Sequence, residues 1–191
     1  MQGYTYAECL TTLQAVGPTL TGSTSATSLL NAQAKVTLKP GFFDRAGKAV
    51  LIKAAGQLGN IVTTPGTLTI DVRMGPTSNI VVWNGGAMQL SSTAHTTLPF
   101  VLEVLLTCRA TGGGTSANLM GQGIMTAQSL SLTAVADSAT TPATLLLPNT
   151  APTVGTGFDA GVAMVVDLFG TFSLNNANAI TVQQYWLYEV N

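Results

Sequence analysis

Apolar and polar residues alternate with a period of two along much of the chain that follows Lys48. The alternation is clearest in residues 66–74, 99–110, 129–134 and 162–174. Successive side chains of a β-strand point to opposite faces, so each of these segments predicts a strand with one buried face. The residues expected on the buried faces are Leu68, Ile70, Val72, Met74, Phe100, Leu102, Val104, Leu106, Cys108, Ala110, Leu130, Leu132, Val162, Met164, Val166, Leu168, Phe172 and Leu174.

Further strands are expected near residues 48–56, 79–84, 117–126 and 179–190, and glycine- or proline-containing turns separate the predicted strands. No segment has a helical stripe, and no repeat of 20 to 50 residues is evident. Eight or so strands of this kind predict an all-β fold, an antiparallel β-sandwich of the jelly-roll type. The irregular stretch 137–158 is expected to form a surface loop.

The first thirty residues are polar, small and rich in turn formers, a composition that cannot bury enough apolar surface to fold alone. We therefore divide the chain into an extended N-terminal arm, residues 1–30, and a jelly-roll domain, residues 31–191. Ordering such an arm costs about 1 to 2 kcal/mol per residue, which contact with another subunit would offset. The apolar anchors expected to make that contact are Tyr4, Tyr6, Leu10 and Leu13.

Charge is scarce in this chain. Asp, Glu, Lys and Arg make up 8% of its 191 residues, against about 25% in an ordinary soluble domain. Either the surface is kept wet by Ser, Thr, Asn and Gln, or much of it is covered by neighbouring subunits, where charges are depleted because desolvating them is costly. The net charge of −1 excludes a globally basic nucleic-acid binder.

The inventory of reactive side chains argues against an enzyme. The single histidine, His95, lies in a segment expected to be a loop, without a GxSxG nucleophile motif, and the eight acids are scattered singly. Cys9 and Cys108 belong to no zinc-ligand cluster, and we expect them to be unlinked. We therefore predict no catalytic residue, no cofactor and no metal site.

The segment 179–190 is apolar or aromatic on both faces, with Ile180, Val182, Trp186, Tyr188 and Val190 expected on one side and Tyr185 and Leu187 on the other. It is either a central strand beneath a long loop or a strand with one face against a neighbouring copy, where Trp and Tyr are favoured anchors. Under the second interpretation the interface residues are Trp186 and Tyr188, together with Val165 and Phe169 from the preceding strand.

Several runs of sequence carry a resemblance to a known class of protein. KPGFF, GKAVLIKAAGQLGNIVTTPGTLTIDVRMG, SSTAHTTLPFVLEVLLTCRATGGGTSANLMGQG and FDAGVAMVVDLFGTFSLNNANAITVQQY together span roughly residues 38–190. In texture and strand spacing they resemble small jelly-roll structural proteins encoded by tailed bacteriophages. The resemblance implies a capsid decoration or head-fibre-base protein, or else a tail component, often built as a trimer.

We therefore expect a virion structural protein that binds itself, as a homotrimer, and attaches through its arm to the major capsid protein or another virion protein. No nucleic acid is expected as a partner because of the net charge of −1, and no membrane, since the chain has no basic secretory start and no run of about 18 apolar residues. Such a chain would be made in the host cytoplasm. A receptor- or glycan-binding module displayed on the virion is the alternative.

Overall fold

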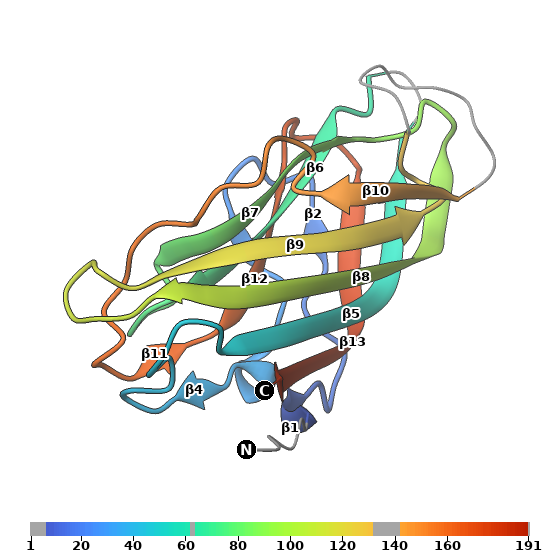
Figure 1. Ribbon diagram of the computed structural model, residues 1–191. Helices are drawn as coiled ribbons and strands as arrows, with labels where there is room; N and C mark the ends of the chain where they lie inside the picture. The colour runs from blue at the N-terminus through green and yellow to red at the C-terminus, as the bar shows by residue number, and fades with distance from the viewer. Residues whose placement is uncertain (1–6, 62–63, 132–141, 191) are drawn as a thin grey trace.

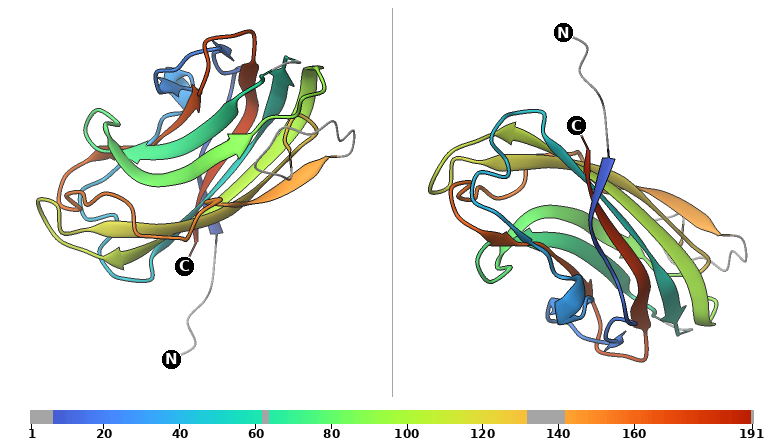
Figure 2. Two further views of the ribbon diagram at one scale, coloured as in Figure 1. Left: turned by 90° about the horizontal axis from the view of Figure 1, so that it is seen from above. Right: turned by 90° about the horizontal axis from the view of Figure 1, so that it is seen from below.

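The chain folds as an antiparallel β-sandwich, in a computed structural model that describes residues 7–61, 64–131 and 142–190. Two sheets lie one over the other as separate layers, with the hydrophobic core between them (Figure 2). The strands pair in nested order, since β5 pairs with β13 and β6 pairs with β12. Nested antiparallel pairs of this kind are typical of a jelly roll, so the predicted fold class is confirmed.

The larger sheet has one continuous order, β1-β13-β5-β8-β9-β10, with β2 paired to β13. In Figure 1 the long strands β5, β8 and β9 run side by side across the molecule. Its strands are β1 (Ala7–Thr12), β2 (Leu20–Thr21), β5 (Ala49–Asn60), β8 (His95–Ala110), β9 (Asn118–Ala127), β10 (Ala143–Leu147) and β13 (Ala179–Val190).

The smaller sheet has the order β3-β12-β6-β7, and two short strands form a separate pair, β4 with β11. One 3-10 turn, η1 (Ala32–Ala34), begins after Asn31, whose side chain accepts a hydrogen bond from the Ala34 backbone N–H. Within the described parts of the chain, no helix is long and apolar enough to cross a bilayer. The remaining strands are β3 (Thr27–Ser28), β4 (Thr37–Leu38), β6 (Thr67–Met74), β7 (Ile80–Gln89), β11 (Met164–Val165) and β12 (Asp167–Phe172).

The buried faces of the two clearest strands are those that the alternation predicts. In β6 the four predicted apolar residues, Leu68 to Met74, are fully buried, and in β8 the same holds for the five from Phe100 to Cys108. Ala110, the sixth predicted in β8, is only half-buried, because the register shifts after Cys108. In the segment 162–174 the prediction holds at Met164, Val166, Leu168 and Phe172 but is wrong at both ends. Val162 and Leu174 lie beyond the paired strands, in turns, and are exposed.

Two expectations for the region 129–158 are corrected. Residues 142–158 do not form only a surface loop, because β10 pairs along its full length with β9 and extends the larger sheet. Leu130 is buried as expected, but it makes an isolated bridge to Leu90 and belongs to no strand. Leu132 lies outside the described residues.

The N-terminal segment is extended, but residues 7–30 pack within their own subunit. β1 pairs with β13, β2 pairs with β13, and β3 pairs with β12. Leu20, Leu29 and Leu30 are buried in the core. The expectation of an arm lying against another subunit is therefore wrong for this segment, because long-range pairing to the C-terminal strands satisfies its backbone and offsets its ordering.

A glycine sets the close approach of the two sheets. A Cβ at Gly121 of β9 would lie 2.2 Å from Cδ1 of Trp83 and 2.6 Å from Cδ2 of Leu106. Trp83 comes from β7 in the smaller sheet, so its indole fills the space that Gly121 leaves open. The bulk of the indole is thereby buried between the layers.

Candidate interaction surface

The outer face of the larger sheet, the side turned away from the smaller sheet, is largely apolar. We define this outer face by residues whose Cα pairing places them in common rows across β13, β5, β8, β9 and β10. They are Gln184, Trp186, Tyr188, Leu51, Lys53, Ala55, Val101, Glu103, Leu105, Gln122, Ile124, Thr126, Thr144 and Leu146.

Four large apolar side chains on this outer face are open to solvent. Val101 is 57% exposed, Leu105 43%, Ile124 42% and Leu146 76%. Single exposed apolar residues are normal, but contiguous ones mark a surface that another molecule covers. Leu105, Ile124 and Leu146 also line one shallow depression, whose floor includes Gly123. The outer face therefore has the character of an interaction surface.

One ion pair lies in the middle of these apolar side chains. Lys53 of β5 and Glu103 of β8 are direct cross-strand partners, and their Nζ and Oε2 atoms lie 3.0 Å apart. No other residue of this defined face is charged, and Arg109, which is exposed near the end of β8, lies beyond its rows. The row that crosses the sheet through the ion pair is Trp186, Lys53, Glu103, Ile124 and Leu146.

A β-bulge in β13 decides which aromatic residues reach the outer face. The register of β13 against β5 shifts between Val182 and Gln184. Before the bulge Ile180 and Val182 point into the core, and after it Tyr185 and Leu187 do so. The predicted grouping of Ile180 and Val182 with Trp186 and Tyr188 is therefore wrong, because the extra residue reverses the alternation.

Trp186 and Tyr188 nevertheless lie on the outer face, where an interface role requires them, and both are half-buried.

Tyr185, from the inward side of the same strand, is completely buried, and its hydroxyl has no hydrogen-bond partner among the described residues. Burial, followed by the negative charge of Asp167, raises the pKa of the Tyr185 phenol far above its ordinary value.

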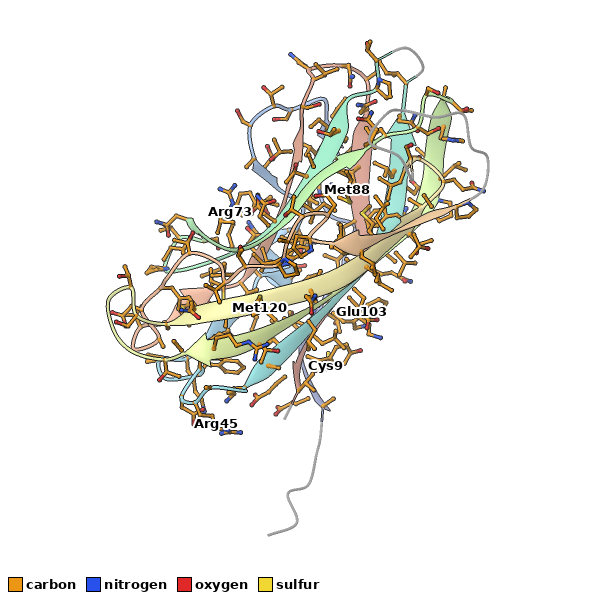
Figure 3. All side chains as sticks on the ribbon, turned by 45° about the horizontal axis from the view of Figure 1, so that its top comes forward. Cys9, Arg45, Arg73, Met88, Glu103 and Met120 are labelled. Carbon is orange, nitrogen blue, oxygen red and sulfur yellow. The ribbon has the colours of Figure 1, made fainter. Side chains whose placement is uncertain are left out.

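The outer face of the smaller sheet is polar by contrast. Arg73 binds Asp71 through Nε at 2.7 Å, and Lys35 Nζ lies 2.8 Å from Asp167 Oδ2. The hydrogen bond to Asp71 raises the pKa of Arg73. Figure 3 labels Arg73 on this sheet and Glu103 on the larger one. The two sheets therefore present opposite chemistry to their surroundings.

The other predicted interface residues lie apart from the outer face of the larger sheet. Phe169 is half-buried on the smaller sheet, where the Arg73 guanidinium covers its ring at 4.3 Å from the centroid. Val165 is half-buried and pairs with Thr37 in the β4–β11 ribbon. Leu10 and Leu13 pack against the core of their own subunit, and Tyr4 and Tyr6 lie outside the described residues.

The residues considered for chemistry are not assembled into a reactive site. His95 is the first residue of β8 rather than part of a loop, and no described carboxylate forms an ion pair with it. No group of three or more His, Cys, Asp or Glu side chains gathers in the described ranges. Cys9 and Cys108 are both free, as predicted, with Cys9 exposed and Cys108 buried.

A second concave feature lies between β7 and the chain after β10. This cleft of 430 Å³ is lined by Val81, Trp83 and Asn84 on one side and by Thr150, Thr153 and Thr156 on the other. Trp83 is 3% exposed, and its indole N–H has no hydrogen-bond partner in the described structure. The cleft offers amide and hydroxyl groups but no exposed aromatic ring.

The sequence alone does not single out Val101, Leu105, Ile124 and Leu146 as candidates for the interface. One signal was available in the segment 99–110. Two of the five positions that alternate with its buried residues, Val101 and Leu105, are large and apolar where polar residues are expected. Ile124 and Leu146 could not be joined to them from sequence, because β9 and β10 reach this face through long-range pairing.

Comparison with known proteins shows no family for this chain. No family model matches it, and no curated protein matches it. Among solved structures, the CBM2 module of the evolved Dit protein of Lactobacillus casei BL23 phage J-1 is similar at 8% identity and a TM-score of 0.34, covering 98% of this chain and 97% of that one. Peanut lectin bound to a 9mer peptide is similar at 8% identity and a TM-score of 0.37, covering 95% and 84%.

Proposed function

We propose that this protein is a non-enzymatic structural component of a tailed-phage virion, which works by packing against further copies of itself. The observation that carries the proposal is the outer face of the larger sheet, where Val101, Leu105, Ile124 and Leu146 are all exposed and Ile124 and Leu146 are direct cross-strand partners. A chain with 8% charged residues has few other means of keeping such a face soluble. Covering the face in an assembly resolves that difficulty.

The virion is proposed as the location because of the sequence resemblance over roughly residues 38–190. Within the virion, a capsid decoration or other head-associated role is our first proposal, and a tail component is the alternative. The attachment role expected for the N-terminal arm is not proposed again for residues 7–30, since these residues pack into their own domain. Contact with the major capsid protein would then use another surface.

The proposal is tested first by the oligomeric state of the purified full-length chain. Sedimentation equilibrium from about 1 to 100 μM, a range that brackets micromolar dissociation constants, is expected to show a reversible homo-oligomer. A chain that stays monomeric throughout would contradict the proposal. Labelled antibodies against the protein, imaged on intact virions by electron microscopy, then test its place on the head or the tail.

A glycan- or receptor-binding module displayed on the virion is the second candidate. The observation in its favour is the cleft lined by Asn84, Thr150, Thr153 and Thr156, whose amide and hydroxyl groups suit the hydroxyls of a sugar. Against it, Trp83 is buried, so no ring on the cleft is open for stacking. Calorimetric titration with host-surface glycans, compared between the wild type and Asn84→Ala, distinguishes this candidate from the first.

A further inference from the structure

We propose that the outer face of the larger sheet binds the same face of a second copy, about a two-fold axis that runs parallel to β5 and β8 and passes between Lys53 and Glu103. The inference rests on the proposed function, since it names the partner and the geometry of the same surface. It is argued from the position of one ion pair and from the residues around it.

The ion pair lies at the centre of the sheet. In the order β1-β13-β5-β8-β9-β10, three strands lie on either side of the boundary between β5 and β8. Lys53 and Glu103 face each other across that boundary, with 45% and 43% of their side chains exposed. The centre of the outer face therefore carries one positive and one negative charge, side by side.

Charge selects the axis. A two-fold rotation about a line along the strands exchanges β5 and β8 across the interface, so each Lys53 lies over Glu103 of the partner subunit. A rotation about a line across the strands would instead place β5 over β5, with Lys53 over Lys53 and Glu103 over Glu103. Opposite charges attract and like charges cost several kcal/mol at an interface, so the first axis is favoured.

The same rotation brings apolar residues together. Leu51 and Leu105 are cross-strand partners in the next row, and the rotation lays each over the other in the second copy. Ala55 meets Val101 in the same way. Further out, Trp186 of β13 comes over Ile124 of the partner subunit, because both lie one strand from the central pair in the row of Lys53 and Glu103. The four central strands are therefore complementary to themselves in charge and bring these apolar side chains together, while Leu146 of β10 comes over Thr12 of the partner subunit.

The available area is that of a stable interface. Five strands about 4.8 Å apart and nine residues at about 3.4 Å each give a face of roughly 24 by 30 Å, or about 700 Å². A standard protein interface buries about 800 Å² on each partner. The face as a whole, with its polar and apolar side chains together, is thus close in area to one side of a standard interface.

The test uses two charge reversals in the full-length chain. Lys53→Glu leaves two acids on each face, and Glu103→Lys leaves two bases, so each variant alone opposes like charges in both cross-interface contacts. We expect each to raise the dimer dissociation constant at least about tenfold, since like charges cost several kcal/mol. An equimolar mixture of the two variants should restore association, because both contacts then join opposite charges.

Controls separate folding from pairing. The double variant Lys53→Glu/Glu103→Lys is expected to associate like the wild type, and Arg109→Glu, a charge reversal at the end of β8, is expected to change the dissociation constant less than threefold, as rim charges do. Thermal melting of each single variant by circular dichroism shows that the fold is intact, since the altered pair is exposed.

The outcomes separate this inference from the proposed function. Wild-type protein that is monomeric at about 100 μM, well above micromolar dissociation constants, overturns both. A trimer, or an oligomer that neither reversal weakens, overturns the face-to-face pair and leaves a homo-oligomeric structural protein standing. A monomer whose outer face binds a different virion protein overturns both the face-to-face pair and packing against further copies. Loss of pairing in each single variant with recovery in the mixture supports it.

Discussion

Lys53 of β5 and Glu103 of β8 hold their charges 3.0 Å apart at the centre of an otherwise apolar sheet face, and both side chains remain nearly half exposed. A second ion pair, between Lys35 and Asp167, lies on the smaller sheet at 2.8 Å with the Asp167 carboxylate 1% exposed. The contrast in exposure predicts different contributions to folding.

Removing the exposed pair should change the free energy of unfolding little, whereas removing the buried pair should lower it clearly. Lys53→Ala is expected to alter the monomer's free energy of unfolding by less than about 1 kcal/mol, because exposed ion pairs are screened by water. Lys35→Met should lower it by about 2 kcal/mol or more, since Asp167 stays buried without its cation. Urea denaturation of both variants at a concentration where the chain is monomeric measures the difference; equal effects would contradict this assignment.

Two leucines of one strand test the assignment of its faces. Leu102→Ala should lower the free energy of unfolding by about 2 to 5 kcal/mol, because Leu102 is fully buried in the core. Leu105→Ala should lower it by less than about 1 kcal/mol in the monomer, because Leu105 lies on the outer face. Denaturation of the two variants side by side is the measurement, and the opposite ranking would mean that the faces of β8 are reversed.

Gly121→Ala tests the packing between the layers. The added methyl group would meet both the Trp83 indole and the Leu106 side chain at less than 3 Å, so one or both side chains must move. We expect a loss of about 1 to 3 kcal/mol in the free energy of unfolding, with a change in tryptophan fluorescence. Gly114→Ala tests whether steric contact is the cause, since a Cβ at Gly114 meets nothing within 4 Å, although its positive φ adds some backbone strain.

The buried phenol of Tyr185 predicts a loss of stability in alkali. Its pKa is raised in the folded protein, so the unfolded chain releases the proton first, near the ordinary value of 10.0. Stability from this group is therefore complete below about pH 10 and falls by about 1.4 kcal/mol per pH unit above it. Tyr185→Phe should remove that part of the decline, measured by denaturation between pH 8 and 11, while Tyr188→Phe on the outer face serves as the matched control.

The two thiols should differ in reactivity. Cys9 is exposed on β1, whereas Cys108 is buried on the core face of β8, where desolvation raises its pKa. A thiolate is the reactive form, so a thiol reagent at pH 7.5 should label Cys9 rapidly and Cys108 only after unfolding. Mass spectrometry of the chain labelled with and without urea gives the number of modified thiols in each state. Rapid double labelling of the folded protein would contradict the burial of Cys108.

Much of the fold follows from the local alternation of side chains. The inward faces of β6 and β8 were predictable because a strand turns successive residues to opposite sides whatever its neighbours are. The scarcity of charge in the composition likewise indicated a surface that is either kept wet by Ser, Thr, Asn and Gln or covered by neighbouring subunits. By the same local logic the absence of a nucleophile motif beside His95 argued against an enzyme, which stays a prediction.

The predictions that the structure corrects for the N-terminal segment, β10 and β13 concern places where pairing with distant segments decides the local structure. The N-terminal segment lacks the apolar residues to fold alone, yet β13 lies beside it and supplies the hydrogen bonds that order β1. The three leucines of β10, Leu145 to Leu147, show no alternation, so only the pairing with β9 identifies this segment as a strand. The β-bulge before Gln184 reverses which residues of β13 face the core. The local sequence pattern does not indicate where a strand contains such an extra, unpaired residue.

The sequence by itself thus determined that the chain forms strands, which faces of the longest ones turn inward, and that its surface carries few charges. Only the tertiary structure decided that Val101, Ile124 and Leu146 share one face with the Lys53–Glu103 pair at its centre. The reason is physical: alternation is a property of one strand's backbone, whereas a surface is made by strands whose pairing is settled by burial across the whole chain.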